Sequence, residues 1–299
     1  MTPIALMGAL EIGLIFALVA LGVLISFRIL DFPDLTADGS FPLGGAVAAT
    51  LIAGGHDPWL ACGFGALAGA VSGLVTAWLH VRLNILQLLA SILVMIALYS
   101  INLRIMGAPN MPLIGSPTVF APFIGEALEN SWLVQPAVLA VIIVAAKIAL
   151  DLFFASQTGL AMRATGANPR MARAQGVATE RMVLSGMALS NALIALAGAL
   201  YVQTQGGADV SMGVGTIVVG LAAVIIGETL LPSRKLWVIT LATIIGALLY
   251  RLLIAVALNA DFIGLQAQDL NLITALLVGF ALVLPKLKAK FSRKAGGKH

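Results

Sequence analysis

Charged residues are scarce in this chain of 299 residues: Asp, Glu, Lys and Arg make up 10% of it, whereas soluble domains carry about 25%. A normal water-facing surface is therefore excluded, and the mean hydropathy of +1.04 agrees. The single cysteine, Cys62, excludes an intrachain disulfide and a cysteine-based metal site. The absence of Pro-rich, Ser-rich or Gln-rich tracts excludes extended disorder before the carboxyl-terminal tail. This composition is that of an integral membrane protein.

Long apolar runs stand where charges are missing. A helix needs about 20 apolar residues to cross the hydrocarbon of a bilayer. Windows of this kind occur at 6–27, 43–55, 59–80, 84–103, 132–152, 183–203, 210–231, 236–257 and 270–285. Their continuous apolar character favours helices over the alternating pattern of membrane strands. The sequence therefore predicts an all-α fold, a polytopic membrane helix bundle of about nine transmembrane helices. We expect one domain over residues 1–285 and a basic cytoplasmic tail at 286–299.

The second window, 43–55, is too short to cross a bilayer alone. It follows a polar stretch at 31–42 that contains two prolines. Irregular backbone at membrane depth is tolerated only where it is buried in protein or lines a wet cavity. We therefore predict one broken crossing over residues 31–55.

The basic residues indicate the orientation of the chain. With nine crossings, most of the 17 Lys and Arg residues fall on the side of the carboxyl terminus, while Arg104 falls in a loop on the other side. Loops rich in Lys and Arg lie in the cytoplasm, which predicts an amino terminus outside and a carboxyl terminus inside. The first window follows no Lys or Arg and exceeds a signal-peptide core, so we expect a retained helix. The net charge of +4 reflects this bias and indicates no nucleic-acid partner.

The longest cytoplasmic loop, residues 156–182, is predicted to contain two short helices. The first covers 159–165 and is ended by Gly166. The second is capped by Asn168, has a proline in its first turn and ends near Gly176.

The second of these helices offers a surface for a partner protein. Met171, Ala172 and the pair 174–175 form a small apolar face beside Arg170 and Arg173. A short cytoplasmic helix of this kind fits a groove of another protein. The alternative is a surface loop whose arginines only satisfy the positive-inside rule.

Polar residues inside the predicted spans are candidates for a translocation path, because they are costly in a membrane. Asn84, Gln87 and Ser91 have the spacing of one helical stripe in the fourth window, where we expect Asn84 to pack and the other two to line the path. The predicted path residues are Asp34, Thr36, Asp38, Ser40, Gln87, Ser91 and Asn191. For those in the broken crossing the alternative is a cytoplasmic loop with helix-capping side chains, and for Asn191 it is hydrogen bonding between helices.

The other charged residues near the membrane have simpler interpretations. Lys147 and Asp151 are four residues apart on one helix and are expected to pair. Glu228, just before Pro232, is predicted to be a gate or a contact of the coupling segment. No spacing of His, Cys, Asp or Glu indicates a metal site.

Two further patterns concern helix packing and symmetry. Gly65, Gly69 and Gly73 repeat every four residues, which allows a close approach of helices. Trp59 and Trp237 each open a window that is followed by a similar Leu-Asn-containing segment, as inverted repeats would.

Three segments resemble a known family. The loop sequence TGLAMRATGANPRMARAQGV at 158–177 is similar to the coupling segment of bacterial ABC importer permeases in the branched-chain amino acid and ribose permease superfamily, which have type II importer architecture. The sequences FPDLTADGS at 32–40 and VGLAAVIIGE at 219–228 resemble two further parts of these proteins. The resemblance is closest to permeases paired with aromatic amino acid binding proteins. The sugar-type members have an additional amino-terminal helix.

The resemblance implies a role and a set of partners. The chain would be the permease subunit, without catalytic residues, of a multi-pass importer in the bacterial inner membrane. It would work as a homodimer among membrane lipids, with an ABC ATPase inside and a periplasmic or lipid-anchored binding protein outside. ATP and Mg²⁺ would bind only to the ATPase, since the chain has no G-x-x-x-x-G-K-[S/T] sequence and is expected to bind no cofactor itself. The coupling residues would be Gly159, Leu160, Met162, Arg163, Gly166, Asn168, Pro169, Arg170, Met171, Ala172, Arg173 and Gly176.

Some alternatives remain at this stage. The substrate implied is a small polar solute, an amino acid first, with sugars and nucleosides as alternatives. A secondary transporter or channel would need no ATPase, although it would not explain the coupling segment. An intramembrane enzyme would need a nucleophile with its base or a metal set, and neither is present among the spans.

Overall fold

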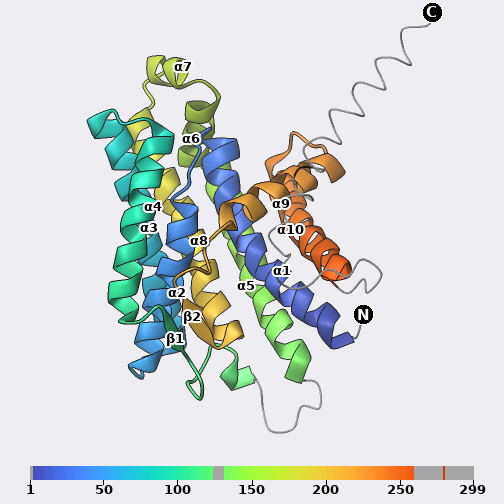
Figure 1. Cartoon of the computed structure of the whole chain (residues 1–299). Coiled ribbons are helices and arrows are strands. Elements are labelled where there is room, and N and C mark those ends of the chain that lie inside the picture. The colour runs from blue at the N-terminus through green and yellow to red at the C-terminus, as the bar shows by residue number, and fades with distance from the viewer. Residues whose placement is uncertain (1–2, 124–130, 259–278, 280–299) are drawn as a thin grey trace, which may run out of the picture.

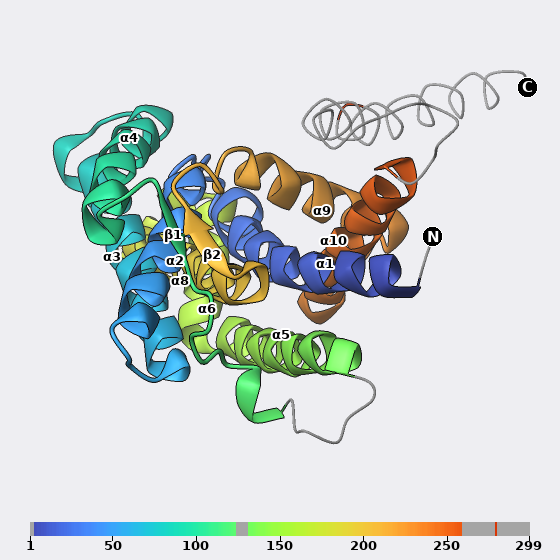
Figure 2. The ribbon, with the colours of Figure 1, turned by 60° about the horizontal axis from the view of Figure 1, so that its bottom comes forward.

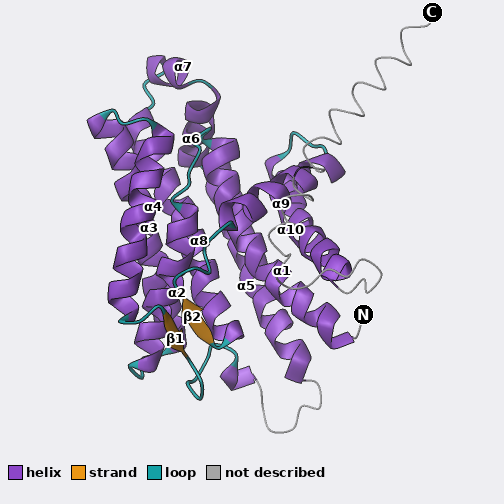
Figure 3. Cartoon of the chain, viewed as in Figure 1, coloured by secondary structure: helices purple, strands orange, loops and turns teal. Residues whose placement is uncertain are grey.

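The computed structural model describes residues 3–123, 131–258 and 279. Helices dominate these residues, as Figure 3 shows, and the only strands among them form one short antiparallel pair. Apart from residue 279, the ninth window, 270–285, lies outside the described residues, as does the predicted tail at 286–299. The all-α fold class is confirmed.

Six helices of the described residues are long and apolar enough to cross a membrane. The long helices are α1 (Pro3–Val23), continued by the π-helical turn η1 (Leu24–Ile29), α3 (Pro58–Leu83), α4 (Gln87–Met106), α5 (Ser131–Ala155), α8 (Thr179–Gln205) and α10 (Leu236–Leu258). The shorter elements are α2 (Ala37–Ala53), the 3-10 turn η2 (Ala121–Phe123), α6 (Gln157–Ala167), α7 (Pro169–Ala174) and α9 (Thr216–Leu230), with the strands β1 (Asn110–Pro112) and β2 (Gly207–Asp209). The chain is therefore a multi-pass membrane protein.

Two crossings are broken, whereas the sequence predicted one. The segment between η1 and α2 is not helical, as expected for residues 31–55. The window 210–231 was expected to be a continuous helix, but α9 begins only at Thr216, after Gly215 with a φ of +83°. A helix of this length spans only about 22 Å at 1.5 Å per residue, so α9 cannot cross a bilayer alone.

The two broken crossings meet at their helix amino termini. Asp38 lies in the first turn of α2, and its carboxylate accepts the backbone N–H groups of Gly215 at 3.2 Å and Ile217 at 2.8 Å at the start of α9. An acidic side chain at this position also interacts favourably with the positive end of the helix dipole. From this junction α2 and α9 extend toward opposite ends of the bundle (Figure 1).

The helices are arranged as two inverted halves. The units α1–α2–α3 and α8–α9–α10 each consist of a long helix, a short helix after non-helical backbone, and another long helix that begins one residue before Trp59 or Trp237. The first helix of each half packs on the last two helices of the other half: α8 packs on α2 and α3, and α1 packs on α9 and α10. This arrangement agrees with the positions of the two tryptophans, whereas the Leu-Asn segment that follows the window of Trp237 lies outside the described residues.

The long helix α1 belongs to the first half but packs among the helices of the second half. Figure 2 shows α1 between α5 and the pair α9 and α10, and 67% of its membrane window is buried. Only 22% of the window in α5 and 28% of that in α4 are buried, so these helices lie at the periphery. Their exposed apolar side chains are suited to lipid or to another protein.

The small-residue ridge of α3 packs against α8 as predicted. A Cβ atom on Gly69 would lie 2.3 Å from Cβ of Ala195, and one on Gly73 would lie 2.2 Å from the carbonyl oxygen of Met187. On Gly65 it would lie 2.9 Å from the carbonyl oxygen of Gly44. The ridge therefore holds α3 close to both α8 and α2.

Candidate functional site

The coupling segment contains the two helices that the sequence predicted. Asn168 caps α7, because its side-chain oxygen accepts the backbone N–H of Met171 at 3.1 Å. Gly176 follows α7 with a φ of +82°. The predicted break at Gly166 is wrong, since α6 continues to Ala167. Gly166 serves a close contact instead: a Cβ atom there would lie 1.8 Å from the carbonyl oxygen of Ile29.

The predicted coupling residues divide into a buried and an exposed set. Gly159, Met162 and Ala172 are buried, and Ala172 is only 4% exposed. The expectation that Ala172 is part of a free apolar face is therefore wrong, because it packs inside the protein. Most of the others are exposed, and these are Leu160, Arg163, Asn168, Pro169, Arg170, Met171, Arg173 and Gly176. The exposed apolar side chains of α7 are Met171, which is 59% exposed, and Ala174.

Side-chain contacts fix α7 to the start of α8. The guanidinium of Arg173 donates to the hydroxyl of Thr179 from Nε at 3.3 Å and from Nη2 at 3.1 Å. These contacts join α7 to α8, a crossing helix that packs on α1, α2 and α3.

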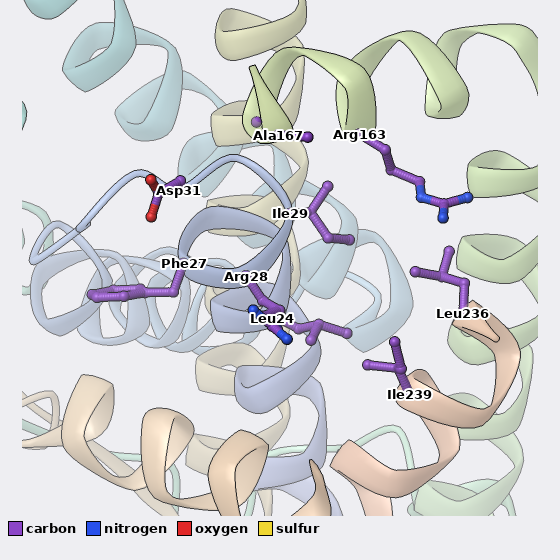
Figure 4. Close-up of a pocket in the computed structure, with 10 residues that line it drawn as sticks. Leu24, Phe27, Arg28, Ile29, Asp31, Arg163, Ala167, Leu236 and Ile239 are labelled. Atoms are coloured by element: carbon purple, nitrogen blue, oxygen red, sulfur yellow. The ribbon is translucent and has the colours of Figure 1, made fainter. Parts of the chain in front are cut away.

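A second contact, between Gly166 of α6 and Ile29 of η1, lies at the edge of a cavity. The cavity, of about 530 Å³, lies between η1, α6 and the start of α10, and both Arg28 and Arg163 line it (Figure 4). Arg28 also donates from Nε to Glu228 Oε1 at 2.6 Å, which joins η1 to the end of α9. Glu228 therefore lies at a contact between the two halves, on the face of the bundle that carries α6 and α7. Its predicted role as a gate stays a prediction.

The polar residues of the first broken crossing form a buried hydrogen-bond network. Asp34 accepts the backbone N–H of Thr36 at 2.9 Å and the amide Nδ2 of Asn191 at 2.7 Å. Ser40 donates to Oδ1 of Asn191 at 2.7 Å. The four side chains are at most 1% exposed. In this conformation the predicted path residues Asp34, Thr36, Ser40 and Asn191 thus hold α2 to α8, and they contact one another instead of an open channel.

Two residues of this network escaped the sequence analysis. The hydroxyl of Ser72 lies 2.7 Å from that of Ser40, and the hydroxyl of Thr76 lies 2.7 Å from that of Thr36. Both lie on α3, three residues after Gly69 and Gly73 respectively, so the face of the glycine ridge was a signal that could have identified them.

The predicted polar stripe of the fourth window is not formed. Asn84 lies in the loop before α4 with a φ of +53°, so it is not on the helix that carries Gln87 and Ser91. Ser91 is fully buried and donates to the carbonyl of Leu88, while Gln87 is half-buried at the first residue of α4. Their assignment to the path stays a prediction.

Two other charged groups behave as expected. Lys147 donates to Asp151 within α5, and Asp151 also accepts the hydroxyl of Thr240 at 2.7 Å. This pair therefore joins α5 to α10 and needs no functional role. Within the described part of the chain, no group of three or more His, Cys, Asp or Glu residues is placed to hold a metal ion.

Comparison with known proteins identifies the family. The family described as "Branched-chain amino acid transport system / permease component" matches residues 5–284. A tyrosine transport system permease protein of Clostridioides difficile is 40% identical over 267 residues, which are 89% of this chain and 86% of that protein. An uncharacterized protein of Rickettsia prowazekii is 35% identical over 93% of this chain and 96% of its own. A nucleoside ABC transporter permease protein of Lactococcus lactis is 31% identical over 58% of each chain. No solved structure matches significantly.

These matches agree with the resemblance of the segments 32–40, 158–177 and 219–228. The family match covers nearly the whole chain, and the described helices form a multi-pass membrane protein of the kind that such a family requires. The chain belongs to the family of branched-chain amino acid transport system permease components.

Proposed function

We propose that the chain is the membrane-spanning permease subunit of an ATP-driven importer for an amino acid with an aromatic side chain. The coupling segment carries this proposal: α7 presents Met171 and basic side chains to a partner, while Gly166 of α6 packs on Ile29 and Arg173 binds Thr179. A force applied to α7 therefore reaches both η1 and α8. The name of the tyrosine permease relative supports the substrate class, and the nucleoside permease relative, which matches a smaller share of the chain, supports it less.

The proposed complex contains two copies of this chain in a bacterial inner membrane, with the amino termini outside. Two ATPase subunits bind ATP and Mg²⁺ and dock on the α6–α7 face, and an external binding protein delivers the substrate. Closure of the ATPases moves the two coupling segments and switches the path from outward-open to inward-open. The predicted path residues, including Gln87 and Ser91, line the path in the conformations that this movement opens.

Replacing Met171 with glutamate tests the docking of the ATPase. The expected result is loss of ATPase copurification with unchanged membrane insertion, because a charge replaces the exposed apolar contact of α7. The matched control is Leu86→Glu, since Leu86 is 75% exposed in the loop before α4, on the same side of the bundle but outside the coupling segment. Copurification that is equal for the two variants would contradict the assignment of α7 as the docking helix.

Glu228→Gln tests the proposed gate. The ion pair with Arg28 is partly exposed, so its loss is expected to change the free energy of unfolding by less than about 1 kcal/mol. ATP-driven uptake is nevertheless expected to fall several-fold, because the contact between η1 and α9 is weakened, and the exchanged pair R28E/E228R is expected to restore part of it. Glu180→Gln, an exposed glutamate in the first turn of α8, is the control. Equal uptake by E228Q and E180Q would contradict the role of Glu228 as a gate.

A further inference from the structure

Arg251 is a cation placed inside a membrane-crossing helix. It lies on α10, and the helix end at Leu258 is about 10 Å away at 1.5 Å per residue. An arginine at such a depth is costly without an anion or access to water. Among the residues that the structure describes, no carboxylate lies within ion-pair distance of it. Its side chain lines a cavity instead.

The cavity of Arg251 is lined by residues from both halves of the bundle. Its volume is about 210 Å³. The lining residues are Ile12, Phe16, Tyr201, Met212, Val214, Gly215, Thr216, Val219, Arg251 and Ile254. This volume is below the roughly 300–1,000 Å³ of pockets for drug-sized ligands, so it suits a molecule no larger than a single amino acid.

One wall of the cavity is aromatic. Phe16 of α1 stacks on Phe41 of α2 with ring centroids 5.9 Å apart, and Phe41 contacts Tyr201 of α8 at 5.4 Å. The three rings form a continuous cluster, of which Phe16 and Tyr201 face the cavity. A planar side chain packs well against such a wall.

The second broken crossing supplies the remaining wall. Discontinuous helices within membranes commonly form substrate sites, with the positive ends of their dipoles directed at anionic groups. Here Gly215 and Thr216, at the start of α9, line the cavity. However, Asp38 already accepts the N–H groups of Gly215 and Ile217, which occupies this helix terminus. Arg251 is therefore the cation that the cavity offers to a ligand.

We propose that this cavity binds the amino acid in transit: Arg251 pairs with the α-carboxylate, and the aromatic wall formed by Phe16 and Tyr201 contacts the side chain. This inference rests on the proposed function and assigns its substrate to a site between α1, α8, α9 and α10. The site is distinct from the buried network of Asp34 and Asn191. A charge-assisted contact of this kind also explains why an arginine is retained in α10 at this depth.

The first experiment measures ATP-dependent uptake of L-tyrosine by proteoliposomes that contain the permease, its ATPase and its binding protein. Arg251→Gln is expected to reduce uptake at least about tenfold, the effect of losing a charged hydrogen bond, while ATPase copurification is retained. Arg251→Lys keeps the charge and is expected to retain more uptake than R251Q. Arg104→Gln is the matched control, because Arg104 is an exposed arginine in the last turn of α4.

A second pair of variants tests the cavity without changing Arg251. Val219→Phe places a ring in the cavity and is expected to reduce uptake, whereas Val218→Phe, at the neighbouring residue of α9 that does not line the cavity, is expected to leave uptake near that of the wild type. Wild-type uptake by R251Q, or equal uptake by V219F and V218F, would overturn the inference and leave the proposed function intact. Absence of ATP-dependent uptake by the wild type would contradict both.

Discussion

Replacing Gly69 with alanine is expected to lower the free energy of unfolding by about 3 kcal/mol, an upper value for overpacking of a tight interface. The added methyl group would lie 2.3 Å from Cβ of Ala195 and 2.4 Å from the carbonyl oxygen of Asn191, so α3 and α8 would have to separate. The displaced residues include Asn191, which binds Asp34 in the buried network. Thermal unfolding of the purified permease in detergent measures the effect.

Gly63→Ala in the same helix is the control for this prediction. Nothing lies within 4 Å of the position that its Cβ atom would occupy. Alanine is a better helix former than glycine by about 1 kcal/mol, so this variant is expected to be as stable as the wild type or slightly more stable. Equal losses of stability in G69A and G63A would show that the ridge does not determine helix packing.

The second large effect is expected from Asn191→Leu. The change removes the donor to Asp34 at 2.7 Å and the acceptor for Ser40 at 2.7 Å, both within a fully buried cluster. Each buried polar group left without its partner costs about 1–3 kcal/mol, and both Asp34 and Ser40 lose a partner here. For a chain of this size, such a loss corresponds to a decrease in the unfolding temperature on the order of 10 °C.

Asn102→Leu is the matched control for the network. Asn102 is also fully buried, but its amide donates only a long bond of 3.3 Å to the carbonyl of Gly39, and its Oδ1 has no hydrogen-bond partner within the described residues. Replacing a poorly satisfied buried amide with an apolar group is nearly neutral. If N191L and N102L unfolded at the same temperature, the network would not be the main polar contact between α2 and α8.

The sequence predicted the features that depend on composition and local pattern. Apolar run length identified the long helices, the caps at Asn168 and Gly176 identified α7, and the four-residue repeat of Gly65, Gly69 and Gly73 identified a packed face. Each of these signals lies within a short stretch of chain. The contacts that they produce follow from helix geometry.

The features that escaped prediction depend on residues far apart in the chain. The break before α9 gives no clear signal, because 210–215 reads as part of an apolar window, and Asp38 caps α9 across 177 residues of sequence. Glycine is common at helix ends, which is why Gly166 was predicted to end the helix. Its actual role is to allow the close contact of α6 with Ile29. The cavity that Arg251 lines is also lined by Phe16 of α1 and Tyr201 of α8, so no short stretch of sequence indicates it.

The exchange of helices between the two halves also constrains how the protein is made. The helix α1 is synthesised well before α8, α9 and α10, yet these helices are among its neighbours in the folded protein. During synthesis, α1 must therefore remain in the bilayer surrounded by lipid or by insertion factors until most of the chain has emerged. Its sequence is suited to remaining in lipid, because Glu11 is the one ionisable side chain between residues 3 and 23. A permease truncated before α9 would leave α1 without its contacts to α9 and α10, and the carboxylate of Asp38 without the N–H groups that it accepts from α9.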